Sequence, residues 1–444
     1  MLKLQSSAPG EWKDLKSIAG WNGMNRKKTR QERKRRKDKE SESDMSVTDK
    51  FLKYVSFDTQ SDASSKTAPS TMKQLKLARQ LKDELLDLGV EDAHVDEFGI
   101  VYASLPANRE QENDRTIGLI AHMDTATELS GKNVHPQIIK NYDGSRIILN
   151  EKYSMSPEQV PGLNNVIGDD LIVTDGTTLL GADDKAGVAI IMQSIENMIK
   201  DNRPHGRVLI AFTPDEEIGR GVDHFNLTSF PADFAYTVDG GDIQSVDYET
   251  FNAAMAKIEF SGRVVHPGDA KNKMVNACAA AVKFAAILPQ WMRPEHTEGY
   301  EGYLHLMKMN GDCDHASLFY LIRDHDRALF EHKKEILKDT ARIVNDLYPD
   351  CCKLEIEDQY YNMKDYMNGS MEAVERAKKA LQARGIEPKS TAIRGGTDGA
   401  CLTEKGLVTP NLGTGGDNYH GRYEYVSINK MNKMVDVVCT LLEG

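Results

Sequence analysis

Along most of the chain, segments with the hydrophobic spacing of helices alternate with short apolar runs typical of strands. Between residues 70 and 88 the apolar positions recur at helical spacing and end before Gly89, which predicts a helix with a glycine stop. Residues 187–199 predict a second, buried helix. Four apolar runs have the length and composition of strands, at residues 100–105, 116–121, 207–213 and 234–238. Because strands and helices alternate, we expect an α/β fold with a mostly parallel sheet flanked by helices.

The pattern changes in the middle of the chain. Residues 253–264 alternate like a half-exposed strand, and the alanine-rich run at 277–288 predicts a long helix. The next predicted elements are strands at 304–306, 317–323 and 353–357 and an amphipathic helix at 330–347. This order is typical of helices on one antiparallel sheet, so we expect an inserted α+β domain at 251–362. The flanking segments, 45–250 and 363–444, then form one larger domain.

Composition and charge limit the class of protein further. A chain of 444 residues is too long for a single core and predicts two domains. With 40% apolar and 28% charged residues it has the composition of a soluble globular enzyme. The net charge of −12 argues against nucleic acid or an anionic membrane as main partner, and no apolar run reaches the roughly 18–20 residues of a membrane span. Six cysteines without metal-type spacing indicate a reducing compartment, so we expect a cytoplasmic protein.

The first 44 residues differ from the rest of the chain. They contain 13 Lys or Arg and 7 Asp or Glu, a charge of +6, which leaves −18 on the remaining 400 residues. Ten of the basic residues lie between Arg26 and Lys39, and no apolar segment follows them as in a signal peptide. We expect either a disordered basic extension or a start upstream of the native one at Met45. A nucleic-acid-binding tail is the less favoured alternative.

Five short motifs place histidine or acidic residues at the edges of apolar runs. They are AHMD with His122, GADDK with Asp183, PDEE with Glu216 and Glu217, TVDGG with Asp239 and NYHG with His420. Three of them directly follow predicted strands, where ligands of α/β sheets collect. Any one of these residues alone is more typical of an ordinary polar position, but their shared placement favours one site. Imidazoles and carboxylates together suit a pair of zinc ions, with cobalt or manganese also admitted, and two ions close together imply hydrolytic chemistry.

The chain also resembles a known enzyme family in ten motifs. In chain order these are HMDT, SGKNVHPQI, TLLGADDKAG, AFTPDEEIG, YTVDGG, VHPG, EGYEG, YYNM, IRGGTDGA and NYHG. From about Met45 to the C-terminus the chain resembles the di-zinc exopeptidase family, which includes carboxypeptidase G and the aminoacylases. The longer motifs are similar to those of its peptidase T group, the tripeptide aminopeptidases. The resemblance implies the di-zinc exopeptidase fold with an inserted lid and dimerisation domain and two zinc ions per subunit.

The resemblance assigns a role to each predicted ligand. Asp183 is expected to bridge the two ions, because a carboxylate has two oxygens. His122 and Asp239 are expected to complete the ligands of one ion, and Glu217 and His420 those of the other.

Two further acidic residues are expected to support catalysis. Glu216, adjacent to a ligand, is the expected general base that takes a proton from water and returns it to the leaving amine. Asp124 lies two residues after His122, on the same side of a strand, and is expected to hold the imidazole through its far nitrogen. Asp184 is adjacent to the expected ligand Asp183. If successive side chains point to opposite sides, Asp184 points away from the site, and we expect a structural role for it.

Three residues outside the ligand set are expected to contact substrate. His266, in the inserted domain, resembles the family histidine that reaches into the active site of the partner subunit and stabilises the oxyanion. Arg394 is suited to a peptide carboxylate through its forked guanidinium, and Arg323 is a weaker candidate for the same task. The resemblance therefore implies a homodimer joined through the inserted domain.

The implied activity is release of the N-terminal residue from tripeptides. Two alternatives stay open: a dipeptidase or N-acyl amino-acid deacylase on the same site, and a catalytically silent peptide-binding protein. The need for a free α-amine separates an aminopeptidase from a deacylase. The silent alternative is disfavoured because every expected ligand and the expected base are present.

Overall fold

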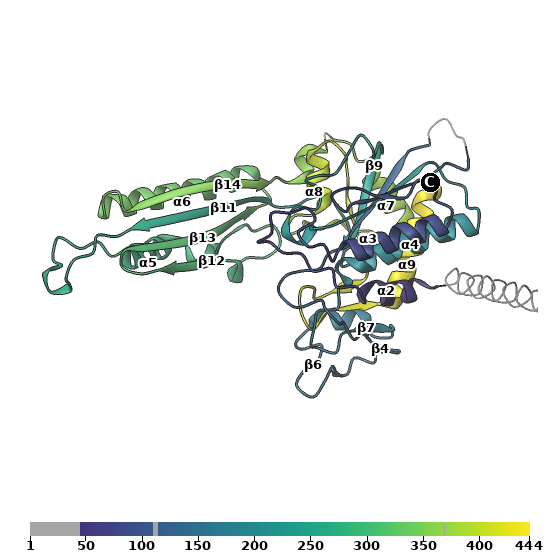
Figure 1. The fold of residues 1–444 in the computed structure, drawn as a ribbon, viewed down its shortest axis with the longest axis horizontal. Coiled ribbons are helices and arrows are strands. Elements are labelled where there is room, and N and C mark those ends of the chain that lie inside the picture. The colour runs from purple at the N-terminus through teal and green to yellow at the C-terminus, as the bar shows by residue number, and fades with distance from the viewer. Residues whose placement is uncertain (1–44, 110–113, 368) are drawn as a thin grey trace, which may run out of the picture.

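The computed structural model describes residues 45–109, 114–367 and 369–444, so the prediction for residues 1–44 lies outside the described residues. Figure 1 shows a broad part, in which helices flank a central sheet, and a slender part, in which helices lie along a second sheet. The chain enters the slender part through β11 (Asn252–Ser261) and leaves it through β14 (Cys352–Tyr360). The slender part is therefore inserted into the broad one, and we propose residues 251–362 as its limits.

A seven-stranded sheet forms the centre of the broad part. In spatial order its strands are β1 (His94–Val95), β2 (Val101–Leu105), β8 (Val208–Thr213), β3 (Ile117–His122), β9 (Phe234–Gly240), β15 (Asn411–Gly413) and β10 (Val246–Asp247). The predicted α/β fold is confirmed. The central strands β8, β3, β9 and β15 are parallel, whereas the outer pairings are antiparallel. Every residue of β3 and β8 is buried, because both faces of the sheet are covered.

The two faces of this sheet are covered by different sets of helices. One face packs on α2 (Val47–Val55), α3 (Leu75–Asp87), α4 (Ala182–Lys200), α7 (Glu372–Ala383) and α9 (Ile428–Glu443). The other packs on α8 (Asp398–Glu404) and on apolar residues of the segment 222–235. The helices predicted at 70–88 and 187–199 correspond to α3 and α4. Helix α9 lies outside the predicted elements, although its buried residues recur at helical spacing and Ser427 caps its first turn.

The inserted part has its own hydrophobic core. Its four antiparallel strands, in spatial order, are β12 (Tyr303–Gly311), β13 (His315–Asp324), β11 and β14. Helices α5 (Ala277–Ile287) and α6 (Arg327–Leu347) pack on one face, and buried and less buried residues alternate along β13 as on a one-sided sheet. The predicted strands at 304–306, 317–323 and 353–357 are all present and are longer than expected. We call this part the lid domain.

The remaining elements are short. Two small sheets comprise β16 (Gly416–Asp417), β17 (Tyr425–Ser427), β7 (Leu171–Val173) and β4 (Gln137–Ile139), and separately β5 (Ile147–Ile148) and β6 (Ser154–Met155). Short 3-10 helices are η1 (Pro161–Val166), η2 (Glu216–Ile218), η3 (Pro267–Asp269), η4 (Gln290–Met292), η5 (Pro294–His296) and η6 (Met363–Tyr366). Among the described residues, no helix is both long enough and apolar enough to cross a membrane.

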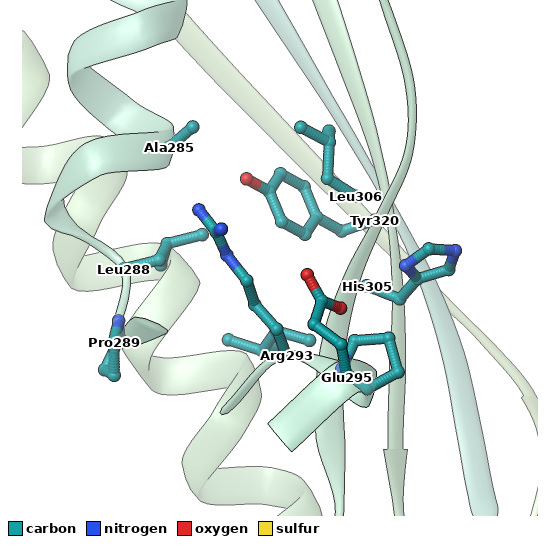
Figure 2. Close-up of a pocket in the computed structure, with 10 residues that line it drawn as sticks. Ala285, Leu288, Pro289, Arg293, Glu295, His305, Leu306 and Tyr320 are labelled. Atoms are coloured by element: carbon teal, nitrogen blue, oxygen red, sulfur yellow. The ribbon is translucent and has the colours of Figure 1, made fainter. Parts of the chain in front are cut away.

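The lid domain contains a cavity of about 260 Å³ between α5 and β12. Figure 2 shows Arg293, Glu295 and the ring of Tyr320 around it, with leucine side chains on its walls. None of the predicted metal ligands lines this cavity. The predicted metal site therefore lies outside this cavity.

Candidate metal centre

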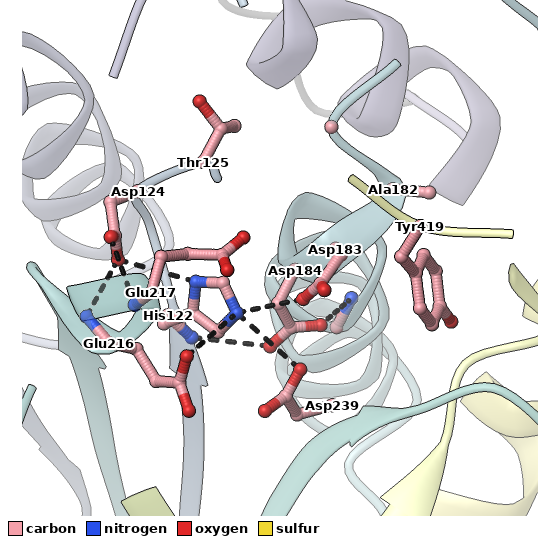
Figure 3. Close-up of polar contacts among 12 residues, drawn as sticks. His122, Asp124, Thr125, Ala182, Asp183, Asp184, Glu216, Glu217, Asp239 and Tyr419 are labelled. Carbon is pink, nitrogen blue, oxygen red and sulfur yellow. Dashed lines mark hydrogen bonds and ion pairs between the residues drawn. The ribbon is translucent and has the colours of Figure 1, made fainter. Parts of the chain in front are cut away.

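The predicted ligands meet where the central parallel strands end. His122 is the last residue of β3, Asp239 lies near the end of β9, and Glu216 and Glu217 form the turn η2 just after β8. Asp183 enters from the first turn of α4, whose backbone at Asp183 and Asp184 is not helical. Figure 3 shows these side chains converging from their separate elements around His122. The expectation that motifs at parallel strand ends would come together is met for this set.

Close packing of α4 against β9 brings two of these carboxylates together. Gly187 in α4 lies so near β9 that a Cβ atom there would stand 1.8 Å from the carbonyl oxygen of Val238. Any larger residue would push the helix away from the strand. The glycine of the motif DDKAG therefore allows Asp183 and Asp239 to approach the same imidazole.

Asp183 lies between the two histidines. Its Oδ1 atom is 2.8 Å from Nε2 of His122, and its Oδ2 atom is 3.2 Å from Nε2 of His420. A second carboxylate accompanies each imidazole: Oδ1 of Asp239 is 3.5 Å from Nε2 of His122, and Oε2 of Glu217 is 3.0 Å from Nε2 of His420. The side chains thus form two groups of one imidazole and one carboxylate that share Asp183.

This arrangement fits a pair of cations. The ligand atoms of His122, Asp183 and Glu217 all lie within 4.8 Å of one another. The second carboxylate oxygen of Glu217, Oε1, is buried without a hydrogen-bond partner, which is costly for an anion unless a cation is near. Nitrogen and oxygen donors of this kind suit a divalent transition metal.

Burial of the acidic groups has an electrostatic cost. Burial, together with the charge of Asp183, raises the pKa of Glu217 to about 8, and burial raises the pKa of Asp239 to about 6. Burial also raises the pKa of Glu216 well above its usual range. Asp183 is the exception, because hydrogen bonds from His122 and His420 outweigh burial and lower its pKa. Bound cations would remove this cost by stabilising the ionised carboxylates.

Glu216 lies beside the ligands but outside their direct contacts. Its Oε2 atom is 4.0 Å from Nε2 of His122, farther than any of the ligand contacts above. The turn that carries it is held by Asp215, which has a φ of 60° and accepts hydrogen bonds from the backbone N–H of Ser70 and from the amide of Gln74. Glu216 is therefore next to the ligand cluster without sharing its contacts.

Asp124 and Asp184 support the backbone around His122. Asp124 Oδ1 lies 3.4 Å from Nδ1 of His122, and its two oxygens accept hydrogen bonds from the backbone N–H groups of Glu216 and Glu217. Asp184 accepts from the backbone N–H groups of His122 and Gly187, although it also lies within 4.8 Å of the ligand atoms of His122 and Asp239. Because both oxygens of Asp184 already have backbone donors, the geometry favours Asp183 as the bridging ligand.

Two buried acidic residues near the site were not predicted. Glu424 accepts hydrogen bonds from the four consecutive N–H groups of residues 180–183. Asp398, whose pKa burial raises to about 7, accepts from the hydroxyl of Thr213 at the end of β8. In the sequence, Glu424 could have been recognised as a charged residue directly before the residues that form the buried strand β17. Asp398 follows the glycines of IRGGTDGA, a motif in which the sequence pattern singles out only the arginine.

The predicted substrate residues are not gathered at this centre. Arg394 donates to the carbonyl oxygens of Gly299 and Glu301 in the lid domain, each at 2.7 Å. Arg323 donates to the carbonyl oxygens of Ala254 and Ile322 and to the side chain of Gln359 within the lid sheet. His266 is exposed in the segment between β11 and α5. Figure 1 shows this segment at the end of the lid domain that is far from the central sheet.

Comparison with known proteins gives consistent matches. The model of the family "Peptidase family M20/M25/M40" matches residues 175–444. A relative named Peptidase T from Caldanaerobacter subterraneus subsp. tengcongensis is 51% identical over 403 residues, 89% of this chain and 98% of the relative. A Peptidase T from Bacillus subtilis is 50% identical over 88% of this chain and 96% of the relative.

Two solved structures share the fold. The aminopeptidase PepT from Bacillus cereus superposes with a TM-score of 0.70 at 23% identity, over 89% of this chain and 97% of that one. A tripeptidase from Staphylococcus aureus superposes with a TM-score of 0.72 at 22% identity, over the same shares. The likeness covers the central sheet and the lid domain together, since both lie within the matched length.

Proposed function

Because the chain belongs to peptidase family M20/M25/M40 and is a peptidase, we propose that it is a metal-dependent aminopeptidase that releases the N-terminal residue from tripeptides. The observation that carries the proposal is the position of Asp183 between the imidazoles of His122 and His420. Each of its oxygens faces one histidine, and each histidine has a second carboxylate. This is the ligand arrangement that two neighbouring ions require.

We propose that His122, Asp183 and Asp239 hold one zinc ion and that His420, Asp183 and Glu217 hold the other. Two divalent ions bound there would acidify a water molecule and polarise the scissile carbonyl. Glu216 then takes the proton of the attacking water and delivers it to the leaving amine, since it lies beside the ligands without being one. Asp124 keeps both Glu216 and the imidazole of His122 in place, because it contacts the backbone of the first and the ring of the second.

Substrate class follows from the relatives. This chain is 50–51% identical to relatives named Peptidase T over 88–89% of its length. That identity supports the same peptidase activity for this chain. We propose that Arg394 binds the substrate carboxylate; its guanidinium is held by the turn at residues 297–301, so that turn would have to release it. For Arg323 the geometry offers less support, because its side chain is buried in the lid sheet.

We also propose a homodimer. The segment with His266 lies at the far end of the lid domain, away from the metal centre of its own chain. A histidine there can stabilise an oxyanion only at the centre of a second copy. The role of His266 and the dimer therefore depend on each other.

The proposed function is tested by hydrolysis of one unblocked tripeptide beside its matched dipeptide, tetrapeptide and N-acetylated forms. We expect cleavage of the unblocked tripeptide, loss of that activity on chelation, and its return on addition of zinc. The N-acetylated tripeptide is the matched control, since it differs only at the α-amine. Preferential cleavage of the blocked form would identify a deacylase, and preference for the dipeptide would identify a dipeptidase. No cleavage by zinc-loaded protein would favour a silent peptide-binding protein.

A further inference from the structure

Glu424 is a buried carboxylate with an unusual set of partners. Its Oε2 atom accepts hydrogen bonds from the backbone N–H groups of Leu180 and Gly181, at 2.7 and 2.9 Å. Its Oε1 atom accepts from the N–H groups of Ala182 and Asp183, at 2.6 and 3.2 Å. The residue is 1% exposed, and within the described part of the chain no lysine or arginine forms an ion pair with it. Among the described residues, the hydrogen-bond donors of Glu424 are therefore these four N–H groups of one segment.

The local backbone is shaped to receive this carboxylate. Gly181 has a φ of 80°, in the left-handed region, where a residue with a side chain would be strained. That conformation turns successive N–H groups toward one point, as in the backbone nests that bind anions. The same segment leads into α4, whose backbone at Asp183 and Asp184 is not helical, so the loop backbone and not the helix end provides these donors.

Glu424 connects two ligands that are far apart in the sequence. It lies four residues after His420, and the segment that it holds ends at Asp183. The buried strand β17 follows directly and fixes the position of Glu424 through its pairing with β7. The contact therefore ties the turn that carries His420 to the turn that carries the shared carboxylate.

Asp124 forms an equivalent connection on the other side of the centre. It follows His122 by two residues and accepts from the N–H groups of Glu216 and Glu217. In both cases an acidic residue just after a ligand histidine holds the backbone of a segment with other ligands. Unlike Asp124, however, Glu424 has no hydrogen bond or ion pair with a ligand side chain among the described contacts, so its direct contacts with the ligand segment are through the backbone.

We propose that Glu424 is a positioning residue of the metal centre: by binding the N–H groups of residues 180–183, it sets where Asp183 stands between His122 and His420. This inference rests on the proposed metal centre. A purely structural role would make Glu424 important for folding but would leave the metal affinity of the folded protein unchanged. The two roles differ in what is lost when the carboxylate becomes an amide of the same size.

The test uses Glu424→Gln in the full chain. An amide offers one acceptor oxygen, so two of the four N–H groups would face an NH2 group instead. We expect zinc affinity, measured by titration of folded metal-free protein well below its melting temperature, to fall by about 10- to 100-fold, the range found for outer partners of metal ligands. We also expect a changed absorption spectrum of the cobalt-loaded protein, since Asp183 would move, and a lower kcat with little change in KM.

Asp247→Asn is the matched control. Asp247 is also a buried carboxylate that accepts a backbone N–H, from Thr391, and it contacts none of the ligands. We expect this substitution to lower the melting temperature and to leave zinc affinity and the cobalt spectrum as in the wild type. If Glu424→Gln does not fold, Glu424→Asp takes its place, because it keeps the charge and shortens the reach by one methylene; an intermediate loss of affinity is then expected.

The outcomes separate the two proposals. Wild-type affinity for two ions in a folded Glu424→Gln or Glu424→Asp protein would overturn the positioning role and leave the metal centre intact. Failure of the wild-type chain itself to bind zinc would instead overturn the proposed function.

Discussion

Replacement of Glu216 by glutamine is expected to lower kcat for an unblocked tripeptide by about 10²- to 10⁴-fold, the usual contribution of a general base. Glutamine has the same shape but cannot take a proton from water. Because Glu216 stands 4.0 Å from the imidazole of His122 and outside the shared contacts of Asp183, both metal ions are expected to remain bound. The measurement is steady-state hydrolysis together with the metal content of the same purified sample.

The neighbouring residue supplies the control for this prediction. Glu217 is adjacent in sequence but contacts His420 at 3.0 Å, so Glu217→Gln is expected to weaken the binding of one ion. If Glu216→Gln loses metal as Glu217→Gln does, Glu216 is a ligand. If Glu216→Gln keeps its activity, another group is the base.

The second large effect is expected from Asp183→Asn. The amide has a single acceptor oxygen, so it cannot serve both histidine groups at once. We expect the affinity for both ions to fall by more than the roughly 10- to 100-fold typical of outer-shell changes, with loss of activity at micromolar zinc. Zinc titration followed by calorimetry measures both binding steps.

Asp239→Asn is the comparison for this variant. Asp239 accompanies only His122, so its replacement is expected to weaken one binding step and leave the other near its wild-type affinity. Equal loss at both steps in the two variants would contradict the bridging position of Asp183.

The sequence predicted that several acidic and histidine side chains of the candidate metal centre would lie together, because their motifs follow strands. Apolar runs located β3, β8 and β9, and parallel strands bring their carboxyl ends to one edge, so His122, Glu216 and Asp239 were expected to meet. The inserted antiparallel domain was likewise visible in the alternation along residues 253–264. The roles of these residues came from the family resemblance and stay proposals.

The contacts that hold the ligands in place were not visible in the same way. Glu424 binds the backbone of residues more than 240 positions away in the sequence. The spacing of hydrophobic residues within one helix or strand cannot predict such a contact. The partners of Arg394 lie in the lid domain, so they depend on how the two domains face each other. Helix α9, by contrast, has a regular apolar pattern that would have supported its prediction.

We propose that five side chains hold two ions that are needed for peptide hydrolysis. The most direct test adds zinc stepwise to metal-free protein while hydrolysis of an unblocked tripeptide is followed. We predict no activity without metal and a rise that reaches its plateau at about two ions per chain, the number that the two histidine groups accommodate. Full activity in the metal-free protein, or no binding of zinc by the folded chain, would contradict the claim.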